Sequence, residues 1–365
     1  MDFQLTEAQK LVRDTARDFV DRELIPHVRE WEEGGEIPRS FYAKMAGLGF
    51  LGAPVPETYG GAGMDYVSFM LLVEEISRGS SSVRTTVSVQ TSLSEASLMW
   101  FGTEAQKRNW LVPLAKGEKF GAWALTEPEA GSDAANLQTT YAVEGDEVVL
   151  DGRKRFISNG SIADYIQVYA RKPGSKRHEG LSLFLVPKDA PGFKVTHVET
   201  KTKLGLRASP TADLAFEDCR IPRENLLGAE GDGWNQILKT LNSGRIGIAA
   251  GAVGVARAAL EAATAYVKER RAFGRPIGDF QLVREMIAQS AVEIDAARLL
   301  TLRAAHLRDL GVDNTLEVSM AKLFGAQMAQ RVTDWAVQVH GGYGFSGDFD
   351  VERYYRDARI LGLYE

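Results

Sequence analysis

The amino-acid sequence predicts an α+β protein of three domains: an N-terminal helical domain, a middle β-barrel or β-sandwich domain, and a C-terminal domain like a four-helix bundle. Two observations lead to this prediction. Apolar residues recur at helical spacing up to about residue 117 and again from residue 231 onward. Between these parts, short segments alternate apolar and polar residues and are separated by turn residues, as in small all-β domains. We therefore expect domains at 1–117, 118–230 and 231–365.

Helix signals mark the N-terminal domain. Thr6 and Gln9 have the spacing of a capping box, and apolar residues follow on one face, so a helix should begin there. The segment YVSFMLLVEEISRG at 66–79 predicts another helix, which follows a glycine-rich loop at 57–65. Thr103 is a candidate N-cap for a helix further along the chain.

Strand signals mark the middle domain. Its alternating segments are DEVVLDGRKRFIS, DYIQVYAR, LSLFLVP, FKVTHV and ADLAFEDCRIP. The dipeptide Asp151-Gly152, inside the first of them, is typical of hairpin turns, so we expect a turn at that position.

Helical periodicity returns in the C-terminal domain. Long helices are expected within 242–274, 279–311 and 315–342. Gly342, Gly344 and Gly347 match the pattern GxGxxG, but a dinucleotide fingerprint requires a strand before it. A helical pattern precedes these glycines, so we interpret them as a glycine-rich turn.

Composition narrows the classes of function. The 365 residues are 44% hydrophobic and 25% charged, and the net charge of −6 argues against nucleic-acid binding. The longest apolar run, 246–256, is too short to span a bilayer. The single Cys219 fits a reducing cytoplasm, and five scattered histidines without an HExxH pattern predict no metal site. The charged N-terminus lacks a secretory pattern, so we expect a cytoplasmic protein without a membrane segment.

Several segments carry polar groups suited to a ligand, and each can also be interpreted without one. WALTEPEAGSDAANL at 123–137 offers hydroxyls and backbone N–H groups to a flat polar ligand, or is only a turn between domains. Phe156, taken alone, is typical of a core residue. The arginines around Phe273, in ERRAFGRPIGDFQ at 269–281, indicate either a solvated surface or a phosphate clamp.

Taken together and in order, these segments resemble one family. The matching segments are LTEPEAGSD, FISNG, LGLRASPTADLAFEDCRIP, SGRIGIAAGAVG, ERRAFGRPIGDFQ, AVQVHGGYGF and the closing YE. They resemble the acyl-CoA dehydrogenase family over essentially the whole chain. The resemblance implies the three-domain fold above, bound FAD and usually a homotetramer. It also implies a reaction: α,β-dehydrogenation of an acyl-CoA thioester to the trans-2-enoyl-CoA, with hydride transfer to the flavin.

The resemblance implies FAD contacts in two groups. The first group would contact the FAD bound by the same chain. It includes Phe156-Ile157-Ser158, where the family usually has Trp-Ile-Thr, so a ring and a hydroxyl are both retained. The second group would reach across a subunit interface to a neighbour's FAD. The first group is Trp123, Leu125, Thr126, Gly131, Ser132, Phe156 and Ser158, and the second is Arg270, Phe273, Gln281, Gln338, Gly341 and Gly342.

The resemblance also implies the catalytic base. Tyr364-Glu365 matches the first half of the family's Tyr-Glu-Gly-Thr, so Glu365 would remove the α-proton, and burial should raise its pKa toward neutrality. The alternative is a solvent-exposed terminal carboxylate. Some members carry the base on a neighbouring helix, but here no acidic residue lies between Asp232 and Glu261. Because the family continues past this glutamate, we expect the natural chain to continue as well.

Substrate selection is only partly predicted. The resemblance places Ser132, Asn242, Arg245 and Tyr364 near the thioester ligand, with Asn242 where the family often has aspartate. The stretch SSVRTTVSVQTSL at 81–93 resembles glutaryl-CoA dehydrogenases, in which an arginine at the position of Arg84 meets a distal carboxylate. Ser77 stands where those enzymes have an acidic residue, and an ordinary surface arginine is the alternative. Acyl-chain length and branching are not predicted.

The implied electron acceptor is an electron-transferring flavoprotein. A flavin oxidase of the same fold, a glutaryl-CoA-type enzyme and a DNA-associated flavoprotein remain alternatives, and a purely structural helical bundle is a further one. The net charge of −6 disfavours the DNA-associated protein.

Overall fold

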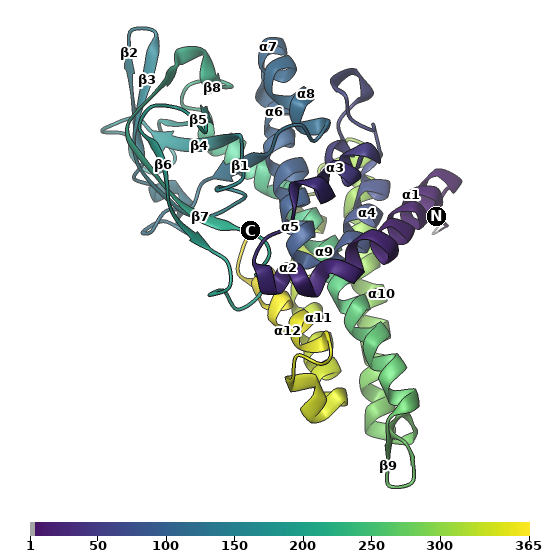
Figure 1. The fold of residues 1–365 in the computed structure, drawn as a ribbon. Helices are drawn as coiled ribbons and strands as arrows, with labels where there is room; N and C mark the ends of the chain where they lie inside the picture. The colour runs from purple at the N-terminus through teal and green to yellow at the C-terminus, as the bar shows by residue number, and fades with distance from the viewer. Residues whose placement is uncertain (1–3) are drawn as a thin grey trace.

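The computed structural model describes residues 4–365 and contains helices, a bent β-sheet and a long helical bundle (Figure 1). The sheet lies beside the upper part of the bundle, and the C-terminus lies next to it (Figure 1). The predicted fold class, α+β with a middle β-domain between two helical parts, is confirmed.

The N-terminal part is helical as predicted. Thr6 and Gln9 form the expected capping box, with Gln9 N donating to Thr6 Oγ1 over 3.2 Å. Thr103 also caps a helix, through a second capping box with Gln106. The helices are α1 (Glu7–Phe19), α2 (Val28–Gly34), α3 (Arg39–Gly47), α4 (Tyr66–Gly79), α5 (Ser81–Ser88), α6 (Ala96–Phe101), α7 (Glu104–Gln106) and α8 (Val112–Ala115), with the π-helical segment η5 (Val89–Glu95) between α5 and α6.

The middle part is a single sheet with the strand order β6-β7-β3-β2-β4-β5-β8, and β1 pairs in parallel with β4. β2 and β4 meet only at Thr140 and Arg171, so the sheet folds over there and encloses an apolar core. The strands are β1 (Gly121–Ala124), β2 (Thr140–Glu144), β3 (Glu147–Ser158), β4 (Tyr165–Arg171), β5 (Leu181–Pro187), β6 (Phe193–Glu199), β7 (Thr211–Pro222) and β8 (Leu226–Leu227).

The prediction of a hairpin turn at Asp151-Gly152 is wrong. These residues lie inside β3, and the chain turns at Gly145 and Asp146 instead. The register between β3 and β7 shifts between Leu150 and Gly152, so the glycine belongs to a β-bulge. A Cβ at Gly152 would lie 2.6 Å from Thr139 Oγ1, which explains why a glycine is needed at this position.

The C-terminal part is built on three long helices. Its first helix begins earlier than predicted, at Gly233, and one face of it contacts α4. The turn after α11 contains the GxGxxG glycines, as predicted. The elements are α9 (Gly233–Glu269), the short strands β9 (Arg271–Ala272) and β10 (Arg275–Pro276), α10 (Gln281–Asp309), α11 (Thr315–His340), the 3-10 turn η10 (Gly341–Phe345), α12 (Val351–Ala358) and the 3-10 turn η11 (Arg359–Gly362).

Helix α9 is the apolar centre of the molecule. By length and composition it could cross a membrane, but 78% of its most apolar window is buried inside the protein, as in the core helix of a globular protein. Its glycines allow close contact with α4: a Cβ at Gly254 would lie 2.2 Å from the carbonyl oxygen of Glu74.

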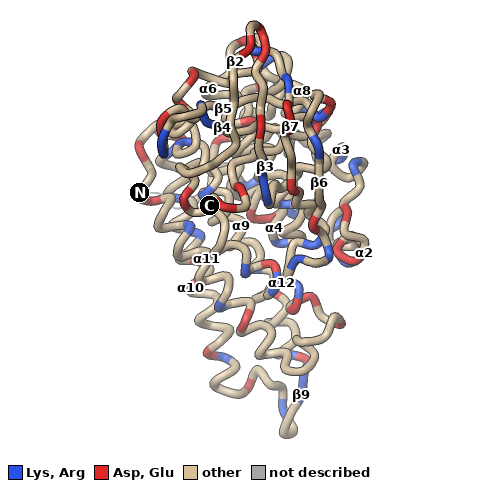
Figure 2. The backbone as a smooth tube through the Cα atoms, turned by 90° about the vertical axis from the view of Figure 1, so that its left-hand side faces the viewer, with Lys and Arg blue, Asp and Glu red and all other residues tan. Residues whose placement is uncertain are grey.

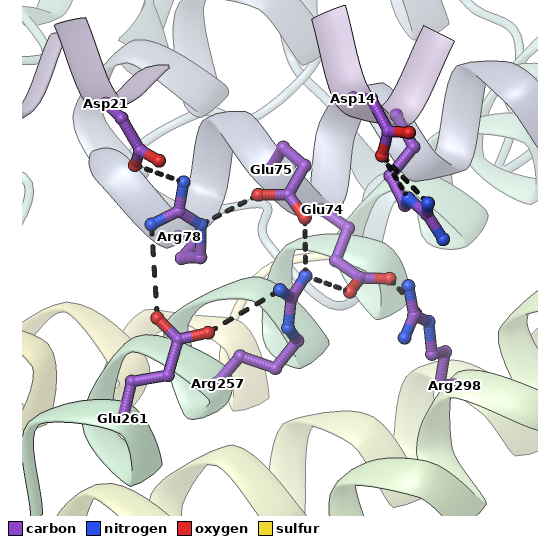
Figure 3. Close-up of polar contacts among 9 residues, drawn as sticks. Asp14, Asp21, Glu74, Glu75, Arg78, Arg257, Glu261 and Arg298 are labelled. Atoms are coloured by element: carbon purple, nitrogen blue, oxygen red, sulfur yellow. Dashed lines mark hydrogen bonds and ion pairs between the residues drawn. The ribbon is translucent and has the colours of Figure 1, made fainter. Parts of the chain in front are cut away.

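A network of buried charges joins α4 to α9 and α10 (Figure 3). Arg257 donates to Glu74 and to Glu75, and Glu75 accepts from Arg78 over 2.7 Å. Arg298 of α10 pairs with the other oxygen of Glu74 at 3.1 Å. Each carboxylate has at least one arginine partner. Because these partners lie on different helices, the network holds α4 in place against α9 and α10.

Charged residues occur throughout the rest of the chain. In the view of Figure 2, basic and acidic positions are interspersed along the backbone, and neither sign gathers on one side. This distribution gives no support to the DNA-associated alternative.

Candidate active site

The last residues of the chain lie between α5 and α9. Beyond η11, the Tyr364 hydroxyl accepts a hydrogen bond of 2.6 Å from Arg84 of α5. Arg245 of α9 donates from Nε to the backbone oxygen of Glu365 over 2.8 Å. The Glu365 carboxylate lies directly over Gly244, where a Cβ would be only 2.3 Å from Oε2. Three predicted residues therefore converge on Glu365, and Gly244 leaves the room for its carboxylate.

The environment of Glu365 suits a base. Burial raises its pKa to about 7, while the positive charges of Arg84, Arg245 and Lys322 oppose that rise. Its Oε2 atom is enclosed and has no hydrogen-bond partner within residues 4–365. The residue as a whole is partly buried, which disfavours the alternative of a solvent-exposed carboxylate. A carboxylate with this pKa can take up a proton near neutral pH.

Arg84 is not a surface arginine, so that alternative is wrong. Its side chain is 1% exposed, and the added Cβ of Gly251 would lie 3.0 Å from its Nε. Apart from the Tyr364 hydroxyl, the guanidinium has few partners: Nε has none, and no carboxylate of residues 4–365 pairs with it within 4.0 Å. Its burial follows from the helix α5, whose residues are all buried.

The facing surfaces of α5, η5 and α9 are small and polar. A Cβ at Gly247 would meet only the hydroxyl oxygens of Ser92 and Ser88, at 3.5 and 3.7 Å. The buried hydroxyls of Ser88 and Ser243 have no hydrogen-bond partner in the described chain. Unpartnered polar atoms of this kind favour a ligand that can hydrogen-bond, rather than a purely apolar one.

Asn242 lies on α9 next to these residues. Its Nδ2 donates to Asn314 Oδ1 over 3.3 Å, and its own Oδ1 is buried without a partner among residues 4–365. It therefore retains an acceptor for a ligand.

The first group of predicted flavin residues lies on two neighbouring segments. Arg155 N donates to Thr126 O over 2.9 Å, which ties the loop after β1 to a bulge in β3. Phe156, on that bulge, has a φ of +59° and is 58% exposed, so the interpretation as a core residue is wrong. Ser158 pairs with Thr211 of β7 and is partly exposed. An exposed ring and partly exposed hydroxyls fit a flavin.

The remaining residues of this group continue the loop. Trp123 is buried in β1, Leu125 is buried where the loop begins, and Gly131 and Ser132 are exposed further along the loop. The exposed end can offer a hydroxyl and backbone N–H groups to a phosphate or to the thioester ligand.

The second group of predicted flavin residues gathers at the far end of the bundle. An open cavity of about 570 Å³ is lined by Arg270, Gly341 and Gly342, together with Tyr266 and His340. The His340 ring stacks on Tyr266 with a centroid distance of 4.2 Å. Phe273 is 95% exposed, and Gln281 and Gln338 are exposed outside the cavity.

The two groups are separated within one chain. The β9 hairpin lies at the lower end of the bundle, whereas the middle sheet and the C-terminus lie at its upper end (Figure 1). A single chain therefore does not bring both groups to one flavin.

The sequence did not indicate every residue of the site. Gly244 and Lys322 were missed, because their importance depends on how closely the chain end approaches α9 and α11. No cluster of metal-ligating side chains occurs among the residues that the structure describes.

Two helical parts around a bent sheet, with a carboxylate of raised pKa held between α5 and α9, fit a flavin-dependent dehydrogenase. Family models match the chain in three consecutive parts: the acyl-CoA dehydrogenase N-terminal domain over 6–118, the middle domain over 122–219 and the C-terminal domain over 231–365. The chain belongs to the acyl-CoA dehydrogenase family. It is a flavin-dependent oxidoreductase that uses FAD and dehydrogenates acyl-CoA.

Individual relatives agree with this assignment. The short-chain specific acyl-CoA dehydrogenase of Clostridium acetobutylicum is 44% identical over 365 residues, which cover 100% of this chain and 96% of the relative. The structure of butyryl-CoA dehydrogenase from Megasphaera elsdenii superposes with a TM-score of 0.97 at 40% identity, covering 100% of this chain and 96% of that chain. A glutaryl-CoA dehydrogenase from Mycobacterium smegmatis in complex with FADH2 has a TM-score of 0.93 at 34% identity, covering 99% and 91%.

Proposed function

We propose that this protein converts a short acyl-CoA to the trans-2-enoyl-CoA, with Glu365 as the base that removes the α-proton. The observation that carries the proposal is the Glu365 carboxylate, placed over Gly244 among three cations and with a pKa raised to about 7. An α-proton beside a thioester is weakly acidic, so its removal needs a base that is ionised yet desolvated. Bound FAD supplies the acceptor for the β-hydride.

The neighbouring residues have positioning roles in this proposal. Arg245 holds the backbone of Glu365 through a hydrogen bond of 2.8 Å, and Arg84 holds Tyr364 through one of 2.6 Å. These contacts fix the chain end on α5 and α9, so that the carboxylate points toward the space above Gly244. On the other side, Thr126, Phe156 and Ser158 would contact the flavin.

A second candidate is an acyl-CoA whose chain ends in a carboxylate. Arg84 favours it, because a buried guanidinium without a carboxylate partner would bind one strongly. The unpartnered hydroxyl of Ser88, also on α5, adds a hydrogen-bond donor near Arg84. The short-chain relatives favour a plain acyl chain, so turnover of the two substrate types decides between the candidates.

We further propose a shared cofactor site and an external electron acceptor. Arg270, Gly341 and Gly342 would bind the FAD of a neighbouring subunit in a homotetramer, since the two groups of flavin residues are far apart in one chain (Figure 1). Electrons would pass to an electron-transferring flavoprotein in the cytoplasm.

A screen of acyl-CoAs with an artificial electron acceptor tests the proposed reaction. We expect turnover of butyryl-CoA or glutaryl-CoA, and much slower turnover of long-chain acyl-CoAs. No turnover of any saturated acyl-CoA by FAD-loaded protein would contradict the proposal. Rapid reoxidation of the reduced flavin in air would instead identify a flavin oxidase.

A further inference from the structure

A lysine in the middle sheet is completely buried. Lys154 of β3 is 1% exposed, and it is among the largest fully buried side chains of the protein. Its Nζ donates to Glu127 Oε1 over 2.8 Å and to the carbonyl oxygen of Leu125 over 3.1 Å. Both acceptors belong to the loop after β1, on either side of Thr126.

Glu127 completes a set of contacts around that loop. Its Oε1 accepts from Thr139 N over 2.9 Å, and its Oε2 accepts from Gln138 N, just before β2. Its backbone pairs with Ala130 in both directions, at 3.0 and 3.2 Å, which closes the loop. The Lys154–Glu127 pair therefore joins β3, the loop and the start of β2.

Fold stability alone does not explain this pair. Removing two charges from water costs several kcal/mol, and a buried ion pair often stabilises a protein no more than apolar residues of the same volume. Burial lowers the pKa of Lys154 to about 8, although Glu127 opposes that change. What the pair does provide is a set of directed hydrogen bonds: it satisfies the Leu125 carbonyl and the N–H groups of Gln138 and Thr139, which lie outside the strands.

We propose that Lys154 and Glu127 are positioning residues that fix the backbone of Leu125, Thr126 and Glu127 for contact with FAD. The inference rests on the proposed role of this loop in flavin binding. Lys154 orients the Leu125 carbonyl, Glu127 anchors the other side of Thr126, and the hydrogen bond from Arg155 N holds the Thr126 carbonyl between them. None of these charged groups needs to touch the flavin.

The test compares the two single variants Lys154→Met and Glu127→Gln with the double variant. Each single variant leaves one charge buried without its partner, so the melting temperature of the apoprotein should fall. The double variant removes both charges and retains the volume, so most of the melting temperature should return. Its dissociation constant for FAD should remain raised at least about tenfold, with an altered flavin absorption spectrum, because the Leu125 carbonyl has lost its donor.

An exposed pair serves as the matched control. Lys194 and Glu217 form a Lys–Glu contact of the same 2.8 Å on β6 and β7, with side chains 61% and 59% exposed. Lys194→Met with Glu217→Gln should change neither the melting temperature nor the FAD affinity appreciably. A stable double variant of the buried pair that binds FAD with unchanged affinity and spectrum would overturn the inference.

A variant of the loop itself separates this inference from the proposed function. Thr126→Trp places a bulky side chain at a partly exposed position of the loop. If the loop contacts FAD, this variant should bind FAD weakly. Weak binding by Thr126→Trp together with normal binding by the buried-pair double variant would refute the positioning role alone. Normal binding by both would refute the loop assignment and the positioning role together.

Discussion

At the scale of single residues, the proposed role of Glu365 as the base can be tested directly. Glu365→Gln retains the shape of the side chain but removes the base. The substrate should still bind and perturb the flavin spectrum, whereas flavin reduction should slow by about 10²–10⁴-fold. Anaerobic stopped-flow absorbance with butyryl-CoA measures both. Flavin reduction at the wild-type rate would show that another group takes the proton.

If Arg84 reads the acyl chain as proposed, it should affect both substrate choice and the ionisation of Glu365. Its positive charge lowers the pKa of Glu365, which burial raises to about 7. Glu365 must be ionised to accept a proton, so kcat/KM should rise with pH through about 7. Arg84→Ala should shift this rise to higher pH and lower the ratio of glutaryl-CoA to butyryl-CoA turnover. An unchanged pH profile and turnover ratio would mean that Arg84 acts on neither. Arg22→Ala, at a side chain that is 78% exposed, is the control.

Gly244 tests how much room the carboxylate needs. In Gly244→Ala the new methyl group would lie 2.3 Å from Glu365 Oε2, so the carboxylate must move away. A displacement of about 1 Å can cost on the order of 10²-fold in rate, so flavin reduction should slow strongly while acyl-CoA still binds. The control is Gly325→Ala on α11, where the nearest atom to the new methyl would be 3.5 Å away. Equal rates in the two variants would contradict the placement of Glu365.

At the scale of helices and strands, the buried charges between α4 and α9 hold these two helices together (Figure 3). Arg257→Met would leave Glu74 and Glu75 short of a partner in the interior, so unfolding free energy should fall by about 3–5 kcal/mol. Chemical denaturation measures the loss. Arg22→Met should cost at most about 1 kcal/mol, because its ion pair with Asp18 is at the surface, with side chains 78% and 72% exposed. Similar losses in both variants would contradict a special role for the network.

The elements differ in how far the sequence could predict them. The long helices and the strands β3 to β7 have local periodicities, so the sequence predicted them, although α9 begins earlier than expected and β1, β2 and β8 were not predicted. The parallel pairing of β1 with β4 has no local signature. The glycine of Asp151-Gly152 serves a β-bulge against which Thr139 packs, and that contact is also absent from the local sequence.

The same distinction applies to the site. Glu365, Tyr364 and Arg245 belong to segments that resemble a family. The burial of Arg84, the space at Gly244 and the pairing of Lys154 with Glu127 depend instead on which elements approach one another. A sequence without its fold does not show those contacts.

At the scale of the whole molecule, cofactor binding and assembly should change together. Arg270→Ala alters a cavity at the far end of the bundle from Glu365, yet it should reduce FAD content and weaken the oligomer. Sedimentation and the absorbance ratio of flavin to protein measure the two effects. A variant that is monomeric but fully loaded with FAD would contradict the shared site. Arg108→Ala, at a surface ion pair with Glu104, is the control.

The separation of the two groups of proposed flavin residues also has a genetic consequence. If each active site takes its base from one chain and its distal cofactor contacts from the next, a lesion at Arg270 damages a neighbour's chemistry and spares its own. A lesion at Glu365 does the reverse. If two inactive variants of these kinds are expressed together, mixed oligomers should form. In these, one active site combines an intact Glu365 from one subunit with an intact Arg270 from its neighbour, so activity should return.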